Sequence, residues 1–203
     1  MNDGGSGRRT LPTVVIDGVE FGMDIRLMPI KSQFALRARH VLNDAVRALE
    51  LLEATNDMRD ARIQYFALVA LLRAVGHVLD KADGGKNERV KAASNARFAE
   101  MKADRESCPL FFEFIEAERN LILKEYNPLG EMCSPTPVLI ASDGSVRLPD
   151  AQPFPMFIFE SGRFNGQDGR DLAAEAIAFW DEYLGDIELE CFGKSFAQGV
   201  GEA

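Results

Sequence analysis

The sequence predicts a mainly α-helical protein, an up-and-down helical bundle with a small accessory β element. Three observations lead to this fold class. Apolar residues recur every three or four positions in several stretches between residues 31 and 126, which is the period of a helix with one buried face. The links between these stretches are short, so successive helices are expected to run antiparallel. Prolines and short β-type runs are concentrated between residues 128 and 159, which indicates a separate small β element.

The N-terminal segment is expected to contribute little to the bundle. Residues 1–10 are polar and Gly-rich, without the apolar segment of a signal peptide, and predict a disordered lead-in. Residues 11–22 predict a short hairpin, because Val14–Ile16 and Val19–Phe21 flank Asp17-Gly18, a favoured two-residue turn.

Three helices follow, over residues 31–54, 58–81 and 87–103. The first is expected to bury a stripe formed by Phe34, Val41, Ala45, Ala48, Leu49 and Leu52, with its charged residues largely off that stripe: Arg37, Arg39, Asp44, Arg47 and Glu50. The second is expected to bury Ile63, Phe66, Val69, Ala70, Leu72, Val75 and Leu79. The third has a thin stripe and should pack on one side only, through Val90, Ala93, Ala96 and Met101.

Turn residues separate these helices. Asn56 or Asp57 can cap the second helix, since a short polar side chain satisfies free N–H groups of the first turn. The run Asp83-Gly84-Gly85 is expected to end it as a turn.

A fourth helix is predicted from Ser107 to Tyr126. Ser107 can cap it, Pro109 is tolerated in its first turn, and Pro128 prevents its continuation. Its predicted apolar residues are Phe111, Phe112, Phe114, Ile115, Leu121, Ile122 and Leu123. Residues 11–127 are therefore expected to form the helical bundle with its N-terminal hairpin.

Residues 128–192 are expected to form a small β element and a C-terminal helix packed on the bundle. A hairpin is predicted from Val138–Ile140 and Val146–Leu148, and a further strand at Met156–Phe159. Asp168 or Asp171 can cap a fifth helix that runs to about Asp186. Its expected buried residues are Leu172, Ala176, Phe179, Trp180 and either Tyr183 or Leu184. Residues 193–203 are expected to form a loose tail.

Composition narrows the classes of function. The 203 residues include three cysteines without paired spacing (Cys108, Cys133 and Cys191) and two histidines. These numbers disfavour a disulfide framework or a zinc site and favour a cytoplasmic protein. No apolar run approaches the ~20 residues of a membrane span, so no membrane association is expected.

Charge is unevenly distributed along the chain. The net charge of −9 disfavours nonspecific nucleic-acid binding by the whole surface. Residues 81–105 nevertheless contain seven Lys and Arg against four Asp and Glu, whereas residues 143–191 contain three against eleven. Two interpretations stay open: solvated helix faces of opposite sign, or a basic face for RNA and an acidic face for a protein partner.

Most familiar catalytic patterns are missing from the sequence. It has no phosphate-binding glycine loop, no HExxH, no CxxC and no nucleophile elbow, and no cofactor is expected. Glu116, Glu118, Glu125 and Glu131 lack the repeated Glu-x-x-His element of a metal-binding bundle, so no metal is expected.

The two histidines have modest predicted roles. His77 lies four residues after Arg73 and shares a helical side with it; it is interpreted as a partly buried histidine beside Gly76 and Val78. His40, next to Arg39, is interpreted as a surface residue.

One pattern points to chemistry: Arg119, Asn120 and Tyr126 in the run RNLILKEY. It resembles the motif of HEPN-domain proteins, an Arg followed by Asn and, five positions after the Arg, a His; HepT-like toxins add a Tyr two positions later. The resemblance covers these eight residues and a compatible helical pattern from about residue 31. It implies a small helical bundle that dimerises, and many such proteins are ribonucleases of toxin–antitoxin and phage-defence systems.

Lys124 stands where the motif has its histidine. In the family that histidine is thought to transfer protons during RNA cleavage, while the arginine stabilises the phosphate. An unperturbed lysine has a pKa about four units above that of histidine, so it stays protonated near neutral pH and is a poor general base. Lys124 therefore suits phosphate binding better than proton transfer.

The leading hypothesis is a catalytically degenerate HEPN-like homodimer that binds RNA or a protein partner, with candidate site residues Arg119, Asn120, Lys124 and Tyr126. A second hypothesis is an active metal-independent ribonuclease that uses Arg119 with Lys124 or His77. A third is a non-enzymatic structural or interaction module, suggested by the acidic C-terminal third.

Overall fold

The computed structural model describes residues 36–135, 138–140, 142–143, 145–147 and 154–194, together with the strands at 14–16 and 19–21. The chain divides into two units, Met1–Gln33 and Phe34–Ala203. In the first unit, β1 (Val14–Ile16) and β2 (Val19–Phe21) pair antiparallel, which confirms the predicted hairpin strands. Other predictions lie outside the described residues: the lead-in 1–10, the turn at 17–18, the helix start at 31–35, the strand end at 148 and the tail at 195–203.

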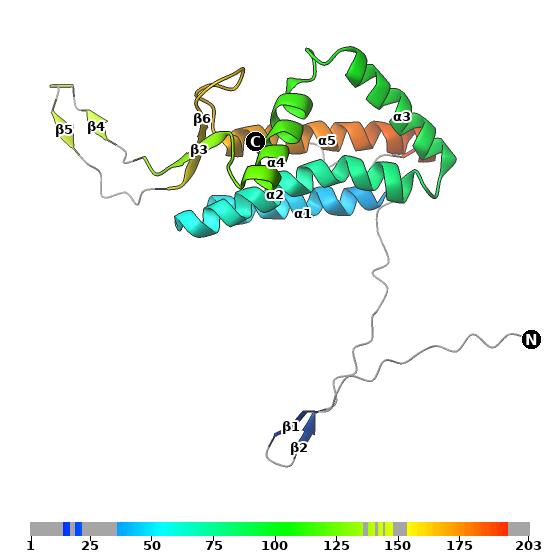
Figure 1. Cartoon of the computed structure of the whole chain (residues 1–203), viewed down its shortest axis with the longest axis horizontal. Coiled ribbons are helices and arrows are strands. Elements are labelled where there is room, and N and C mark those ends of the chain that lie inside the picture. Colours follow the sequence, from blue (N-terminus) through cyan, green and yellow to red (C-terminus); the bar gives the residue numbers. More distant parts are fainter. Residues whose placement is uncertain are drawn as a thin grey trace, which may run out of the picture. The chain divides into compact units, whose positions relative to one another are not determined.

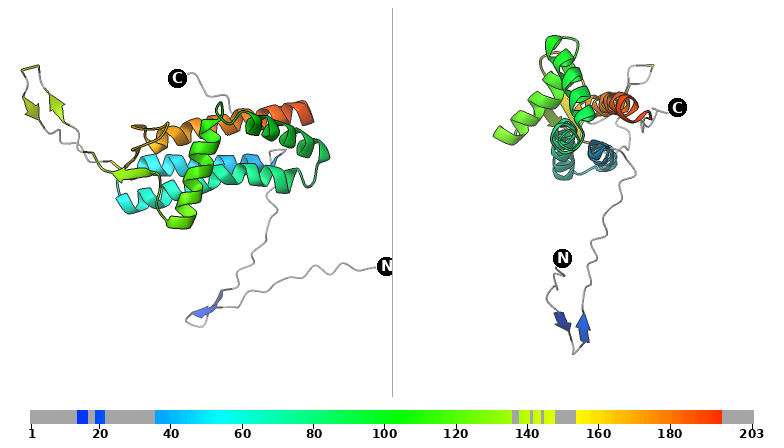
Figure 2. Two further views of the ribbon diagram at one scale, coloured as in Figure 1. Left: turned by 45° about the horizontal axis from the view of Figure 1, so that its top comes forward. Right: turned by 90° about the vertical axis from the view of Figure 1, so that its right-hand side faces the viewer.

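The described part of the second unit contains five α-helices, two of which continue from or into a π-helical turn (Figure 1). They are α1 (Arg37–Ala54), α2 (Met58–Val78) followed by η1 (Leu79–Asp83), α3 (Glu88–Ala103), η2 (Leu110–Glu116) followed by α4 (Ala117–Glu125), and α5 (Gly169–Phe192). Helices α1 and α2 pack together, α5 contacts both, and α4 runs across α2 (Figure 1 and Figure 2). The predicted mainly α bundle is confirmed.

Side-chain caps set three helix starts. Asp57 precedes α2, Asn87 precedes α3 and Asp168 precedes α5, and each side chain accepts from backbone N–H groups of the first turn. These bonds satisfy donors that have no partner within the helix. Of the alternatives open in the sequence, the structure uses Asp57 rather than Asn56 and Asp168 rather than Asp171; the cap at Asn87 is not predicted.

Within the described residues the first helix starts at Arg37. Leu36, which the sequence places inside that helix, has an extended backbone instead. Its first N–H groups, those of Arg37 and Ala38, donate to the buried carboxylate of Asp83 at 2.9 and 3.0 Å. Asp83 therefore does more than mark a turn, since it caps a helix 45 residues earlier in the chain.

The fourth helix is not capped by Ser107. Ser107 is exposed, and its N–H donates to the Asp104 carboxylate at 3.3 Å. The helix starts at Pro109, where the carbonyl of Cys108 accepts from the N–H of Phe112 at 3.3 Å. A proline in the first turn needs no N–H partner, so Pro109 is compatible with this start.

Most predicted core residues are buried in the bundle. The buried ones are Ala45, Ala48, Leu52, Val69, Leu72, Val75, Leu79, Val90, Ala93, Met101, Phe111, Phe112, Phe114, Ile115, Ile122, Leu172, Ala176, Trp180 and Leu184. Partly buried residues that pack against them include Val41, Leu49, Phe66, Phe179 and Tyr183. Helix α5 also runs past the predicted end at Asp186 and buries Ile187 and Cys191 before Gly193 ends it with a positive φ.

Ile63, Ala70, Ala96 and Leu123 are exposed, contrary to prediction. The buried face of α2 is centred on Tyr65, Leu68 and Leu72. Because each residue turns the helix by about 100°, Ile63 lies about 200° away from Tyr65. The sequence prediction placed Ile63 in the core because its side chain is apolar. In the structure, the face of α2 that packs against the other helices contains Tyr65 instead.

The β element consists of two antiparallel pairs. The predicted hairpin is confirmed as β4 (Leu139–Ile140) and β5 (Val146–Arg147). The predicted strand β6 (Met156–Phe159) pairs with β3 (Gly130–Cys133), which the sequence does not predict because Gly-Glu-Met-Cys lacks β-branched residues. The β3–β6 pair places Phe157 and Phe159 in the core, where the Phe157 ring stacks on Tyr65 at 4.0 Å.

Arg39 is buried, although the sequence places it off the buried stripe of the first helix. Its guanidinium forms an ion pair with Asp181 and donates from Nε and Nη2 to the buried Glu188 carboxylate at 3.1 Å. A buried guanidinium is tolerated only when its charge and donors are satisfied. Two acidic residues of α5 provide these partners: Asp181 is 142 and Glu188 is 149 residues away in sequence from Arg39.

One helical stretch in the described residues, Met58–Asp83, has the length and composition of a membrane span. A core helix passes the same test. In this structure the stretch contributes Leu68, Leu72 and Val75 to the bundle core.

Candidate functional site

The four predicted site residues do not form one group: Arg119 and Asn120 lie in the first turn of α4, and Lys124 and Tyr126 at its C-terminal end. Arg119 and Asn120 are half-buried, and the Arg119 Nη1 donates to the Asn120 Oδ1 at 2.9 Å. Lys124 is exposed. Tyr126 ends the helix in the left-handed conformation, with φ of 54° and 64 % of its surface exposed.

Tyr126 contacts the N-terminal half of α2. Its ring meets Phe66 edge-on at 5.1 Å, and the Arg62 guanidinium lies 5.6 Å from the ring centroid. Tyr126 and Arg62 line a cavity of about 450 Å³ together with Glu131 and Glu160. The pKa of Glu160 is raised by its hydrogen bond with Glu131 and by repulsion from it. These two carboxyl groups make the cavity acidic.

Arg119 instead acts on the C-terminal half of α2. Its charge lowers the pKa values of both Arg73 and His77, in addition to the larger effect of burial on each. Arg73 is paired with the Glu116 carboxylate at 3.6 Å. We call Arg73, His77 and Arg119 the cationic cluster; it lies where α2 meets α4.

His77 is exposed, contrary to the predicted partly buried histidine. Its pKa is lowered from 6.5, first by desolvation and then by the charges of Arg73 and Arg119; Asp80 opposes the shift and Lys81 adds to it. The imidazole is therefore neutral near pH 7 and can accept a proton.

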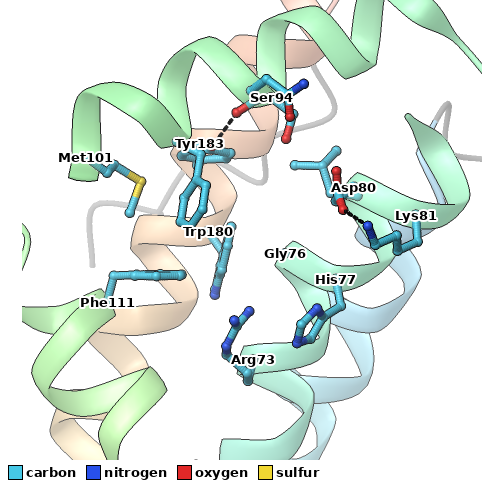
Figure 3. Close-up of a pocket in the computed structure, with 13 residues that line it drawn as sticks. Arg73, Gly76, His77, Asp80, Lys81, Ser94, Met101, Phe111, Trp180 and Tyr183 are labelled. Carbon is cyan, nitrogen blue, oxygen red and sulfur yellow. Dashed lines mark hydrogen bonds and ion pairs between the residues drawn. The ribbon is translucent and has the colours of Figure 1, made fainter. Parts of the chain in front are cut away.

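Beside this cluster lies a partly enclosed cavity of about 390 Å³ (Figure 3). Four parts of the fold line it: the end of α2 with η1, helix α3, η2 and helix α5. We call it the aromatic cavity; its lining residues are Arg73, Gly76, His77, Leu79, Asp80, Lys81, Ser94, Asn95, Phe98, Met101, Phe111, Trp180 and Tyr183. Both π-helical turns border it, and such turns are frequent at functional sites.

Aromatic rings form one side of the aromatic cavity. The Trp180 ring meets Phe111 at 5.8 Å and Tyr183 at 5.4 Å, both edge-on. The Tyr183 hydroxyl donates to the Ser94 carbonyl at 3.3 Å, and burial raises the pKa of Tyr183 to about 12. The Trp180 indole N–H is buried and has no hydrogen-bond partner among the described residues.

Glu118, just before the candidate motif, has a structural role that the sequence does not indicate. It is fully buried, accepts from the Tyr65 hydroxyl at 2.8 Å and from the Leu129 N–H at 2.6 Å, and so holds the start of α4 to α2 and to the residue before β3. Burial raises its pKa, partly offset by these hydrogen bonds. No group of three metal-ligating side chains occurs in the described residues.

The basic and acidic segments of the sequence pack against each other through α3 and α5. Arg97 pairs with Glu190 at 3.1 Å, and Arg89 donates to the Glu190 carbonyl at 3.1 Å. Part of the positive charge of α3 is therefore neutralised within the fold, which leaves the cationic cluster as the stronger candidate for an anion.

The second sequence-based hypothesis pairs Arg119 with His77, and in the structure the charge of Arg119 acts on His77. The sequence missed Arg73 and Trp180 as site residues. The only available signal was the four-residue spacing of Arg73 and His77. Comparison with protein-family models, curated proteins and solved structures finds no match to this chain.

Proposed function

We propose that this chain is a HEPN-like helical protein that binds RNA through the cationic cluster without cleaving it. The observation that carries the proposal is the convergence of Arg73 and Arg119 from two helices beside His77, where the charge of Arg119 lowers the pKa values of both Arg73 and His77. Like charges gather at a cost unless an anionic ligand neutralises them. In a chain of net charge −9, such a cluster selects where a phosphate binds.

Arginine suits this role. Its planar guanidinium carries five donors and binds phosphate oxygens in a bidentate fashion. Glu116 is the acidic partner of Arg73, and at 3.6 Å it leaves guanidinium donors free for a ligand. Phosphate contacts of this kind position a nucleic acid without reading its sequence.

Lys124 supports binding rather than cleavage. It is exposed near the end of α4 and is not part of the cationic cluster. A lysine in water remains protonated near neutral pH, so it can attract phosphate but cannot accept the proton of a ribose hydroxyl.

Metal-independent RNA cleavage is the second candidate function, and the neutral state of His77 favours it. A neutral imidazole beside two guanidinium groups combines a general base with charge stabilisation for a phosphate. In this reading His77, from α2, takes the place of the motif histidine that Lys124 replaces.

The test is fluorescence anisotropy with a labelled single-stranded RNA and the variants Arg119→Ala and Arg73→Ala. Each is expected to weaken binding about tenfold and to reduce the slope of log affinity against log salt by about 0.7, the value for one lost phosphate contact. Arg59→Ala is the matched control: Arg59 is exposed on the same helix, about 21 Å from Arg73 along its axis.

Three outcomes separate the candidate functions. Binding that is lost equally in Arg59→Ala and Arg119→Ala argues against the cationic cluster. If the unsubstituted protein cleaves RNA and the His77→Ala variant does not, the nuclease function replaces the binding function. If the protein binds no RNA at all, the hypothesis that remains is the non-enzymatic interaction module.

A further inference from the structure

The aromatic cavity has the size and chemistry of a small-ligand site. Its volume of about 390 Å³ lies in the usual range for such sites, which are mostly apolar with a few polar groups at fixed positions. Here the apolar part comes from η2, α3 and α5, and the cationic part from α2 and η1 (Figure 3).

The aromatic side of the cavity favours a planar ligand. Phe111 and Trp180 are in edge-to-face contact, and Phe98 meets Phe111 edge-on at 5.9 Å. The Arg73 guanidinium lies 5.6 Å from the Phe111 ring centroid. Unstacked nucleobases bind to aromatic rings and guanidinium planes of this kind, with little dependence on base identity.

The rim of the cavity connects it to the cationic cluster. Arg73 and His77 belong to both, so an anion held by the cluster lies beside the cavity mouth. The nitrogen of the Trp180 indole points toward Arg73 in Figure 3, and it has no hydrogen-bond partner among the described residues. A ligand that displaces the Arg73 side chain would place one of its own acceptor atoms against this N–H group.

We infer that the aromatic cavity receives one unstacked nucleobase, whose phosphate is held at the rim by Arg73 and His77. The inference rests on the proposed RNA binding and extends it, since it assigns the base as well as the phosphate to a place on the protein. The same chemistry is offered by a base of an RNA strand and by a free nucleotide.

Tryptophan fluorescence tests the inference directly, because Trp180 is the single tryptophan of the chain. A single-stranded RNA and a nucleoside monophosphate are expected to quench Trp180, the monophosphate at higher concentration. An abasic strand of equal length is expected to bind the cationic cluster, as measured by anisotropy, without quenching Trp180.

A pair of neighbouring substitutions on α3 tests the location. Asn95 and Ala96 are both exposed, but only Asn95 lines the cavity. Asn95→Phe is expected to fill the cavity mouth, abolish quenching and weaken RNA binding about tenfold toward the affinity of the abasic strand. Ala96→Phe is expected to behave as the unsubstituted protein.

The outcomes distinguish this inference from the proposed function. RNA binding that depends on Arg119 but leaves Trp180 unquenched overturns the nucleobase site and keeps the RNA-binding function. Quenching by the monophosphate without any RNA binding keeps the nucleobase site for a free nucleotide and overturns the RNA-binding function. Equal effects of Asn95→Phe and Ala96→Phe also overturn the assignment to this cavity.

Discussion

Among single residues, His77 is the titrating group of the candidate site. Partial desolvation and the nearby Arg73, Arg119 and Lys81 hold its pKa below 6.5, against the opposing charge of Asp80. The folded protein therefore binds this proton less tightly than the unfolded chain. The contribution of His77 to the free energy of unfolding is therefore complete above pH 6.5, and it is lost as the pH falls from 6.5 through the lower pKa of the folded state. The affinity for an anionic ligand has the opposite pH dependence: it increases as the pH falls, because protonation of His77 adds positive charge to the cationic cluster.

RNA affinity is predicted to increase about two- to fivefold as the pH is lowered from neutral through the lowered pKa of His77, the effect of one added charge at an exposed site. His77→Ala should remove this increase. His40→Ala is the control, since His40 is the other histidine of the chain. Anisotropy titrations at a series of pH values measure the effect, and an NMR titration should place the pKa of His77 below 6.5. An unchanged pH profile in His77→Ala would rule out this role.

Tyr65 and Glu118 show how a single buried pair shapes the site region. Tyr65 stacks on Phe157 and donates to Glu118, which in turn accepts from the Leu129 N–H. An added Cβ at Gly169 would lie 2.6 Å from the Tyr65 hydroxyl, so the first residue of α5 must be small. The pair thereby positions α4, which carries Arg119, relative to α2, which carries Arg73 and His77.

At the scale of elements, the ion pair of Arg39 joins α1 to α5. Arg39 is 2 % exposed and Glu188 is fully buried, so each compensates the charge of the other. Removing one member of such a pair leaves an uncompensated buried charge, whereas replacing both by apolar residues of similar size is often nearly neutral.

Arg39→Ala is predicted to lower the free energy of unfolding by about 3–5 kcal/mol, because the buried Glu188 carboxylate loses the guanidinium that donates to it. The double variant Arg39→Met/Glu188→Met should recover only part of this loss, because Asp181 still loses its ion pair with Arg39. Arg47→Ala on the same helix is the control; its pair with Glu50 is exposed and should contribute less than about 1 kcal/mol. Urea unfolding measures all three. Similar small losses for Arg39→Ala and Arg47→Ala would contradict the proposed importance of the buried pair.

The arrangement of α3 and α5 explains the uneven charge of the sequence. The basic third helix contacts the acidic fifth helix, and Arg97 lies within ion-pair distance of Asp186 and Glu190. The sequence left two interpretations of the charge pattern open, solvated faces of opposite sign and separate binding faces. The contacts favour a third, in which the charges partly compensate each other across one helix interface.

At the scale of the whole molecule, the C-terminal end of α4 exposes apolar surface near the N-terminal half of α2. Leu123 is 59 % exposed and Tyr126 64 % exposed. Large apolar side chains gathered on an otherwise polar helix end are typical of a protein interface. The resemblance to HEPN-domain proteins implies a homodimer, and this surface is where we expect a second copy to bind.

Light scattering after size exclusion is predicted to give twice the mass of one chain. Leu123→Glu should shift the protein to the monomer, because a charge would be desolvated in the interface. Leu189→Glu provides a control on α5, where Leu189 is also 59 % exposed. A monomeric unsubstituted protein, or equal dissociation by both variants, would exclude a dimer through α4.

Much of the fold could be predicted from local signals. The period of the apolar residues predicts the helices, and the pairs Asn56/Asp57 and Asp168/Asp171 indicate where two of them start. These features depend on residues within one or two helical turns, so the sequence contains the whole physical argument. The same holds for the positive charges that Arg119 and Lys124 bring to α4, which follow from their identities.

Tertiary structure decided the features that depend on distant residues. Arg39 is buried because Glu188 lies across from it, and Gly130–Cys133 is a strand because Met156–Phe159 pairs with it. The site follows the same rule: Arg119 meets Arg73 and His77 only because α4 crosses α2, and the aromatic cavity needs residues from four parts of the fold. A local pattern cannot specify such contacts, because they depend on how each element packs against the others.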